Sequence, residues 1–288
     1  MPAQGPLIPR RRLGAELRRL RESAGLHLED AAERLECSTS KISRLETGQG
    51  IPKSRDVRDL LSLYGVDDQR AVERLLRWAG DGKRQAWWQD LSDVMSTNLG
   101  AYISLESESS RMRVFGGSYV YSLFQTPQYA EAMFRDCFPR ADDDSIDGRV
   151  RLREERKAQM SARDEQPRID VILEEAVLRR AVGSPKVMAA QLERLIEVDS
   201  EHDRSLRIYP FSAGADLGIQ CTFVVFTFES DFDRNAVNLE LSGGDRWLEQ
   251  DADVARYTRI FDTLTSKSLS ESESVTMIKK IMSEYRDQ

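Results

Sequence analysis

Residues 37–48 read CSTSKISRLETG, and they decide how the first part of the chain folds. Ser38 suits the N-cap of a short helix, because its hydroxyl can accept a hydrogen bond from a free backbone N–H. Ile42 and Leu45, three residues apart, then share the buried side of this helix. The remaining helical side chains are polar or cationic and face outward: Thr39, Ser40, Lys41, Ser43 and Arg44. Such a face suits the major groove of DNA, although hydroxyls also occur on ordinary solvated helices.

Two helices are expected before this stretch. Apolar residues at helical spacing mark the first: Leu13, Leu17, Leu20 and Ala24. It should stop at Gly25, and a second helix follows from Leu28 to Leu35, with Ala31 and Ala32 small enough to let another helix cross closely. Two short helices joined by three or four residues, the second with a polar outer face, are typical of a helix-turn-helix.

Two more helical patterns complete an all-α domain. Their apolar positions are Val57, Leu60, Leu61 and Tyr64, then Val72, Leu75, Leu76 and Ala79. Five helices in about eighty residues are enough for a compact domain. We therefore predict a five-helix DNA-binding domain with a basic N-terminal arm over residues 1–82 and a second domain over residues 83–288.

The charged residues are also distributed unequally between the two predicted domains. The chain carries a net charge of -7, but residues 1–84 hold 17 Lys and Arg against 13 Asp and Glu, a balance of +4. The remaining residues then carry 25 against 36, a balance of -11. Residues 10–21 contain six arginines and one glutamate, and we expect Arg18 and Arg21 to contact DNA phosphates; a solvated helix face is the alternative.

The stretch LRRLRESAGLHLEDAAERLECSTSKISRLETGQGIP, residues 17–52, resembles the lambda-repressor-like, or xenobiotic-response-element (XRE) type, helix-turn-helix family. This resemblance implies a regulator that binds double-stranded DNA as a homodimer. Glu36 stands where the family's turn usually has glycine, His27 replaces the usual Ser or Thr N-cap, and Leu28 replaces a frequent Gln. These departures concern individual contacts rather than the fold.

The second domain is expected to be mixed α+β. Strand-like runs occur at residues 118–124, 169–173, 206–209, 223–228 and 237–241. Helical stripes alternate with them near residues 188–196, 254–264 and 275–282. Residues 266–274 form a serine-rich stretch that we expect to be an exposed link between the last two helices.

Several stretches of this domain, among them WWQDLSDVMSTNLGAYISLESESSRMRVF (residues 87–115) and VILEEAVLRRAVGSPKVMAAQLERL (residues 171–195), are similar to the C-terminal domain of the Scr-type toxin-antitoxin-like regulators. The resemblance implies an antitoxin-like regulator whose second domain binds a small partner protein. From the -11 charge we expect a partner surface that is basic or at least not strongly acidic. The alternative is a small-molecule effector pocket lined by aromatic residues: Trp87, Trp88, Phe115, Tyr119 and Phe124.

The sequence does not favour an enzyme. His202 has no patterned metal partners, the acidic run at residues 142–144 is a solvated turn, and the glutamates at 174 and 175 fit a helix start after a strand. Residues 212–218 lack the Lys of a phosphate loop and fit a turn between strands. We therefore expect no catalytic residues, no cofactor and no metal site.

The cellular setting follows from composition. The three cysteines have neither metal-ligand spacing nor an even count, which fits a reducing cytoplasm. No apolar run is long enough for a membrane-spanning helix, and the N-terminus has no apolar core of a secretory signal. We predict a cytoplasmic protein without membrane contact.

Overall fold

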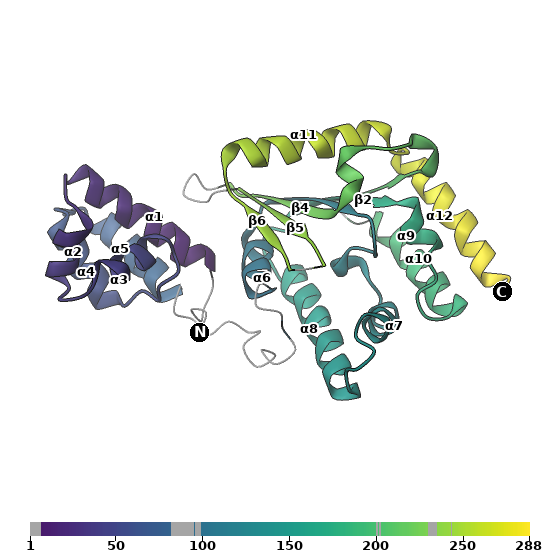
Figure 1. Ribbon diagram of the computed structural model, residues 1–288, viewed down its shortest axis with the longest axis horizontal. Coiled ribbons are helices and arrows are strands. Elements are labelled where there is room, and N and C mark those ends of the chain that lie inside the picture. The colour runs from purple at the N-terminus through teal and green to yellow at the C-terminus, as the bar shows by residue number, and fades with distance from the viewer. Residues whose placement is uncertain are drawn as a thin grey trace. The chain divides into compact units, whose positions relative to one another are not determined.

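The computed structural model describes residues 7–81, 95, 99–199, 201, 203–229, 235–242 and 244–288 (Figure 1). The chain divides into two compact units, and the main boundary falls between Glu108 and Ser109. The predicted domain boundary at residues 82 and 83, like Trp87, Trp88 and His202, lies outside the described residues.

The first unit is helical. Its described elements are α1 (Leu7–Ser23), α2 (Leu28–Arg34), α3 (Thr39–Glu46), α4 (Ser54–Leu63), α5 (Gln69–Asp81) and α6 (Leu99–Glu108). The core of α1–α5 consists of Leu13, Leu17, Ala31, Ala32, Ile42, Val57, Leu60, Leu61, Tyr64, Leu75 and Ala79. The predicted all-α domain is therefore confirmed. Ala24 was expected on the buried face but is exposed, because α1 ends one residue before it.

The turns of the first unit use the left-handed backbone region. Gly25, with φ 70°, follows the end of α1, and Gly65, with φ 70°, follows α4. Glu36, in the turn between α2 and α3, has φ 48°. A non-glycine residue in this region costs on the order of 1 kcal/mol.

A six-stranded sheet forms the centre of the second unit, in the order β3-β2-β1-β4-β5-β6. The strands are β1 (Arg111–Gly116), β2 (Arg168–Glu174), β3 (Arg204–Tyr209), β4 (Thr222–Thr227), β5 (Ala236–Glu240) and β6 (Arg246–Leu248). β1, β2 and β3 are parallel, and β4, β5 and β6 continue the sheet in antiparallel pairs. The mixed α+β class is confirmed.

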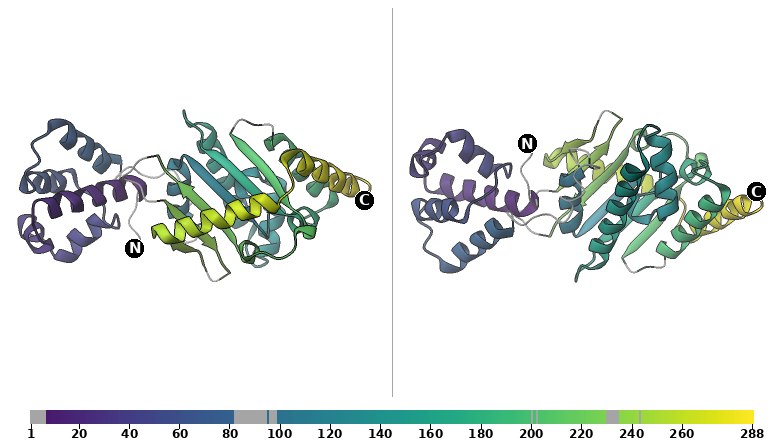
Figure 2. Two further views of the ribbon diagram at one scale, coloured as in Figure 1. Left: turned by 90° about the horizontal axis from the view of Figure 1, so that it is seen from above. Right: turned by 90° about the horizontal axis from the view of Figure 1, so that it is seen from below.

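Helices cover both faces of this sheet. α11 (Asp251–Lys267) lies across one face, and α8 (Asp143–Ser161) lies on the other (Figure 2). The remaining helices are α7 (Pro127–Cys137), α9 (Glu175–Arg179), α10 (Pro185–Asp199) and α12 (Glu271–Arg286). The core between α11 and the sheet includes Phe115 and Phe223 of the sheet and Phe261 of α11. Short 3-10 turns occur at Ser122–Phe124, Phe211–Ala213 and Leu217–Gln220.

Three local predictions in this unit were wrong. The acidic run at residues 142–144 is the start of a helix and not a turn, because Asp142 caps α8 and Asp143 and Asp144 lie in its first turn. Residues 118–124 form a bend and the Ser122–Phe124 turn, and the strand lies earlier, at Arg111–Gly116. The serine-rich stretch is not wholly exposed, because Ser274 is buried and its Oγ accepts a hydrogen bond from the N–H of Ile208 in β3 at 3.0 Å. The link itself is short, since α11 ends at Lys267 and α12 begins at Glu271.

Candidate nucleic-acid interface

Helix α3 presents the side chains that the sequence predicted. The Ser38 hydroxyl caps it by accepting a hydrogen bond from the N–H of Lys41 at 3.3 Å. Ile42 and Leu45 are buried. The exposed residues of the helix and its cap are Ser38, Thr39, Ser40, Ser43 and Arg44. Among the described residues, the Arg44 side chain has no hydrogen-bond or ion-pair partner, so its guanidinium is available to a ligand.

Lys41 is held differently from Arg44. Its Nζ donates to Oδ2 of Asp56, on α4, at 2.8 Å, and its side chain is 42% exposed. This hydrogen bond raises the pKa of Lys41 above its ordinary value. A DNA contact by Lys41 would therefore have to share the ammonium group with Asp56.

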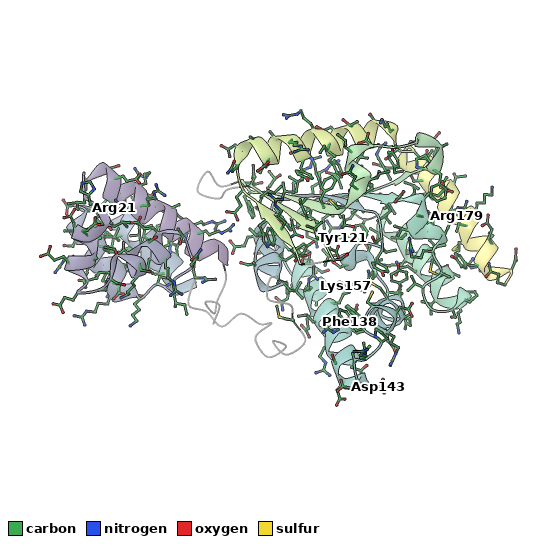
Figure 3. The ribbon with its side chains drawn as sticks, in the orientation of Figure 1. Arg21, Tyr121, Phe138, Asp143, Lys157 and Arg179 are labelled. Carbon is green, nitrogen blue, oxygen red and sulfur yellow. The ribbon has the colours of Figure 1, made fainter. Side chains whose placement is uncertain are left out.

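Arg21, in α1, is buried within the helical unit. Its position is labelled in Figure 3. Its Nε and Nη2 donate to the two carboxylate oxygens of Glu46 at 2.7 and 2.9 Å, and its Nη1 donates to the carbonyl of Leu26 at 2.8 Å. The two bonds to Glu46 join α1 to the end of α3, and the bond to Leu26 joins α1 to the turn that follows it. The expectation that Arg21 contacts phosphates needs correction, because its guanidinium is buried and occupied by internal partners.

Arg18 remains suited to a phosphate. It lies one helical turn before Glu22 and donates to it at 2.8 Å, with its side chain 62% exposed. An exposed pair of this kind is weak and exchanges readily with another anion. Arg18 and Arg21, grouped together by the sequence, thus have different roles.

Gly14 brings α1 and α3 into close contact. A Cβ at this position would lie 2.4 Å from the carbonyl oxygen of Leu45 and 2.6 Å from that of Glu46. Sequence reasoning missed both Gly14 and the partner of Arg21. An isolated glycine inside a helical pattern was the available signal, because it costs about 1 kcal/mol relative to alanine and often marks close packing.

The second unit uses its chemically notable residues for structure. Asp142 caps α8 by accepting from the N–H of Ser145 at 2.9 Å, and Glu175 lies in the first turn of α9. Residues 212–218 connect β3 to β4, as predicted. Asp216 in this connection pairs with Lys267 at 2.6 Å. No cluster of three or more His, Cys, Asp or Glu with metal-binding geometry occurs within the described residues.

The aromatic residues considered for an effector pocket are in part core residues. Phe115 is fully buried and stacks on Phe223 with the ring centroids 5.9 Å apart. Phe124 is buried, and its ring meets that of Tyr121 edge to face at 5.5 Å. The hydroxyl of Tyr119 lies 3.3 Å from the sulfur of Cys137.

The helical unit with a capped, polar third helix contains a helix-turn-helix, and the model of a helix-turn-helix domain family matches residues 12–76. A second family model, described as a domain of unknown function (DUF5753), matches residues 99–280, and the chain belongs to this family. Neither the curated proteins nor the solved structures contain a match. Within the described residues, no helix has the length and apolar character needed to cross a membrane.

Proposed function

We propose that this protein is a transcriptional regulator that recognises specific double-stranded DNA through α3. The observation that carries the proposal is the outer face of α3, where Thr39, Ser40 and Arg44 are exposed while Ile42 and Leu45 anchor the helix. Arginine can bond a guanine edge through two donors, and hydroxyls can bond bases or phosphates. Selection of binding sites from random duplexes, followed by gel shift with the full-length chain, tests this function. Recovery of no common sequence would contradict it.

We further propose an XRE-type mode of binding, as a homodimer on a pseudo-palindrome. One helix-turn-helix covers a half-site, so two copies would read half-sites about one helical turn apart. Light scattering at micromolar concentration together with footprinting tests the dimer. A monomer with a single, unrepeated footprint would contradict it.

For the DUF5753 unit we propose an antitoxin-like, non-enzymatic role in which it binds a small partner protein. The support is the resemblance of several of its stretches to the Scr-type regulators, together with the structural roles of Asp142, Glu175 and Asp216. A partner can change DNA affinity only by its differential affinity for two states of the regulator.

Affinity capture on the tagged full-length chain, with mass spectrometry, tests the partner role. A stoichiometric small protein that changes the gel shift is the expected result. The second candidate is a small-molecule effector. It would be favoured if no protein is retained and a low-molecular-weight fraction of the lysate changes DNA binding instead.

A further inference from the structure

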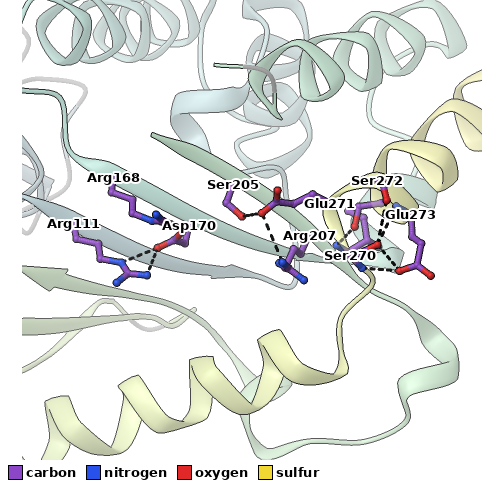
Figure 4. A network of polar contacts seen from close by, with 11 residues as sticks. Arg111, Arg168, Asp170, Ser205, Arg207, Ser270, Glu271, Ser272 and Glu273 are labelled. Carbon is purple, nitrogen blue, oxygen red and sulfur yellow. Dashed lines mark hydrogen bonds and ion pairs between the residues drawn. The ribbon is translucent and has the colours of Figure 1, made fainter. Parts of the chain in front are cut away.

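Arginines from three neighbouring strands gather on the sheet face that α11 crosses. They are Arg111 and Arg113 of β1, Arg168 of β2 and Arg207 of β3, and we call them the arginine surface. Figure 4 labels Arg111, Arg168 and Arg207. The strand register places Arg111 opposite Arg168, Arg113 opposite Asp170, and Arg207 opposite Ile172. Because alternate residues of a strand share one face, these side chains project on the same side as the core residues Phe115 and Ile172.

This part of the face is open to solvent. α11 runs across the sheet and leaves strands beside it uncovered (Figure 2, left). The side chains of Arg111, Arg168 and Arg207 are 37%, 56% and 31% exposed. The apolar side chains that α11 buries therefore occupy only one part of this sheet face, and the arginines lie on the other part.

The carboxylates on the surface bind only a few of the guanidinium donors. Asp170 binds Arg111 through one oxygen, which lies 2.8 Å from Nε and 2.7 Å from Nη2, and it accepts from Nε of Arg168 at 3.0 Å through the other. Glu271, at the start of α12, accepts from the Ser205 hydroxyl at 2.6 Å, and its contact with Arg207 is long, at 3.7 Å. The Nε of Arg113 is buried and has no hydrogen-bond partner among the described residues. Each guanidinium has five N–H donors, so most of the donors here are not used within the described residues.

We propose that the arginine surface is the docking site for an acidic segment of a partner protein, an inference that rests on the partner-binding role proposed above. Carboxylates match the fork of N–H donors on a guanidinium, and several arginines in a plane suit an extended row of them. This revises the expectation of a basic partner surface. Net charge acts over the whole domain, whereas docking depends on the charges within about 10 Å, the screening distance at 0.1 M salt.

A protein segment fits this surface better than a nucleic acid. Residues 85–288 carry 25 Lys and Arg against 36 Asp and Glu, so a long polyanion would cross repulsive regions beyond the four arginines. A short acidic segment would lie over the four arginines and three nearby carboxylates, those of Asp170, Glu271 and Asp262, where the local charge balance is still positive. Charge complementarity of this local kind sets partner choice and association rate.

The test uses the full-length chain and a fluorescein-labelled peptide of about ten glutamates, whose binding is followed by anisotropy at low salt. The main variant is Arg168→Glu with Arg207→Glu. Arg168→Gln with Arg207→Gln removes the charge without reversing it. Arg140→Glu with Arg151→Glu is the matched control, since both residues are exposed and lie outside the arginine surface. Circular dichroism and the melting temperature confirm that each variant is folded.

We expect the reversal to weaken peptide binding about tenfold or more, the neutral variant to give an intermediate loss, and the control to bind as the wild type does. Equal binding by the reversal variant, or an equal loss in the control, overturns the proposal. Loss of binding to non-specific duplex DNA without loss of peptide binding overturns it too, because the surface would then serve nucleic acid.

If a captured partner binds the reversal variant normally, the partner role stands and the arginine surface is the wrong site. If peptide binding is lost in the reversal variant while no partner is captured, the surface stands and the partner role fails.

Discussion

Arg21 and Glu46 join the first helix to the end of the third through two hydrogen bonds of 2.7 and 2.9 Å between guanidinium and carboxylate. Both side chains are less than one-tenth exposed. The pair fixes the end of α3, and with it the direction of the face that is proposed to read DNA. Its two residues lie 25 positions apart in the sequence.

Arg21→Ala should lower the free energy of unfolding of the helical unit by about 3 kcal/mol, because it leaves the Glu46 carboxylate buried without its partner. Urea unfolding followed by circular dichroism measures the change. Arg18→Ala is the matched control and should stay within about 0.5 kcal/mol, since its pair with Glu22 is exposed. A difference between the two variants too small to measure would show that the buried pair does not stabilise the unit.

Arg18→Ala should instead affect DNA binding. Loss of one phosphate contact lowers the slope of log affinity against log salt by about one, with little change in sequence preference. Gel shifts across a range of salt concentrations measure the slope. An unchanged slope would remove Arg18 from the interface.

Gly14→Ala should weaken both stability and DNA binding. The added methyl group meets the carbonyl oxygens of Leu45 and Glu46, which are backbone atoms and cannot rotate away. Overpacking of this kind costs about 1–3 kcal/mol, more than the helix propensity gained. Gly80→Ala in α5 is the control, because nothing lies within 4 Å of the added Cβ. If both variants behaved alike, α1 and α3 would not be as close as described.

Asp56→Asn should raise DNA affinity and increase the salt slope by about one, because it releases the Lys41 ammonium from its internal partner. A gel shift at fixed salt and then at varied salt measures both. Asp59→Asn, also on α4, is the control. Asp59 lies 4.0 Å from Arg34 and 3.9 Å from Arg55, so its replacement releases no closely held cation. Unchanged affinity in Asp56→Asn would place Lys41 away from the DNA.

Asp216→Asn should flatten the acid side of the stability curve. The Lys267 ammonium, with the N–H of Gly218, holds the pKa of Asp216 below its ordinary value. A depressed carboxyl pKa stabilises the fold above the unfolded-state pKa, and this stability is lost as the pH falls through the folded-state pKa. Thermal melts between about pH 6 and pH 3 should therefore change less in Asp216→Asn than in the wild type. Asp144→Asn, in the exposed first turn of α8, should keep the wild-type dependence.

Helices α1 to α5 of the first unit could be predicted from the sequence because their apolar residues recur at helical spacing, whereas α6 was not predicted. The outward face of α3 followed from the same spacing. The pairs Arg21–Glu46 and Lys41–Asp56 could not be predicted from the sequence. They join residues 25 and 15 positions apart, and no sequence pattern encodes such pairs. For this reason the sequence did not reveal that Arg21 is bonded to Glu46 and Lys41 to Asp56 when both cations were assigned to DNA.

The first strand was misplaced for a related reason. β1 alternates Arg111, Met112, Arg113 and Val114, and the charged positions concealed a strand in which one side is buried. The aromatic run that follows was more conspicuous, but it forms a bend and a 3-10 turn. Arg111 and Arg113 of this strand belong to the arginine surface.

The proposed reading of DNA by the face of α3 depends most on Arg44, because its side chain is exposed on that face and has no hydrogen-bond or ion-pair partner among the described residues. The measurement is the affinity of Arg44→Ala for the selected site, by gel shift at fixed salt, beside Arg77→Ala, an exposed arginine of α5. We expect Arg44→Ala to lose about 1–3 kcal/mol of specific binding and Arg77→Ala to keep its affinity. Full specific affinity in Arg44→Ala, or an equal loss in both variants, would contradict the claim.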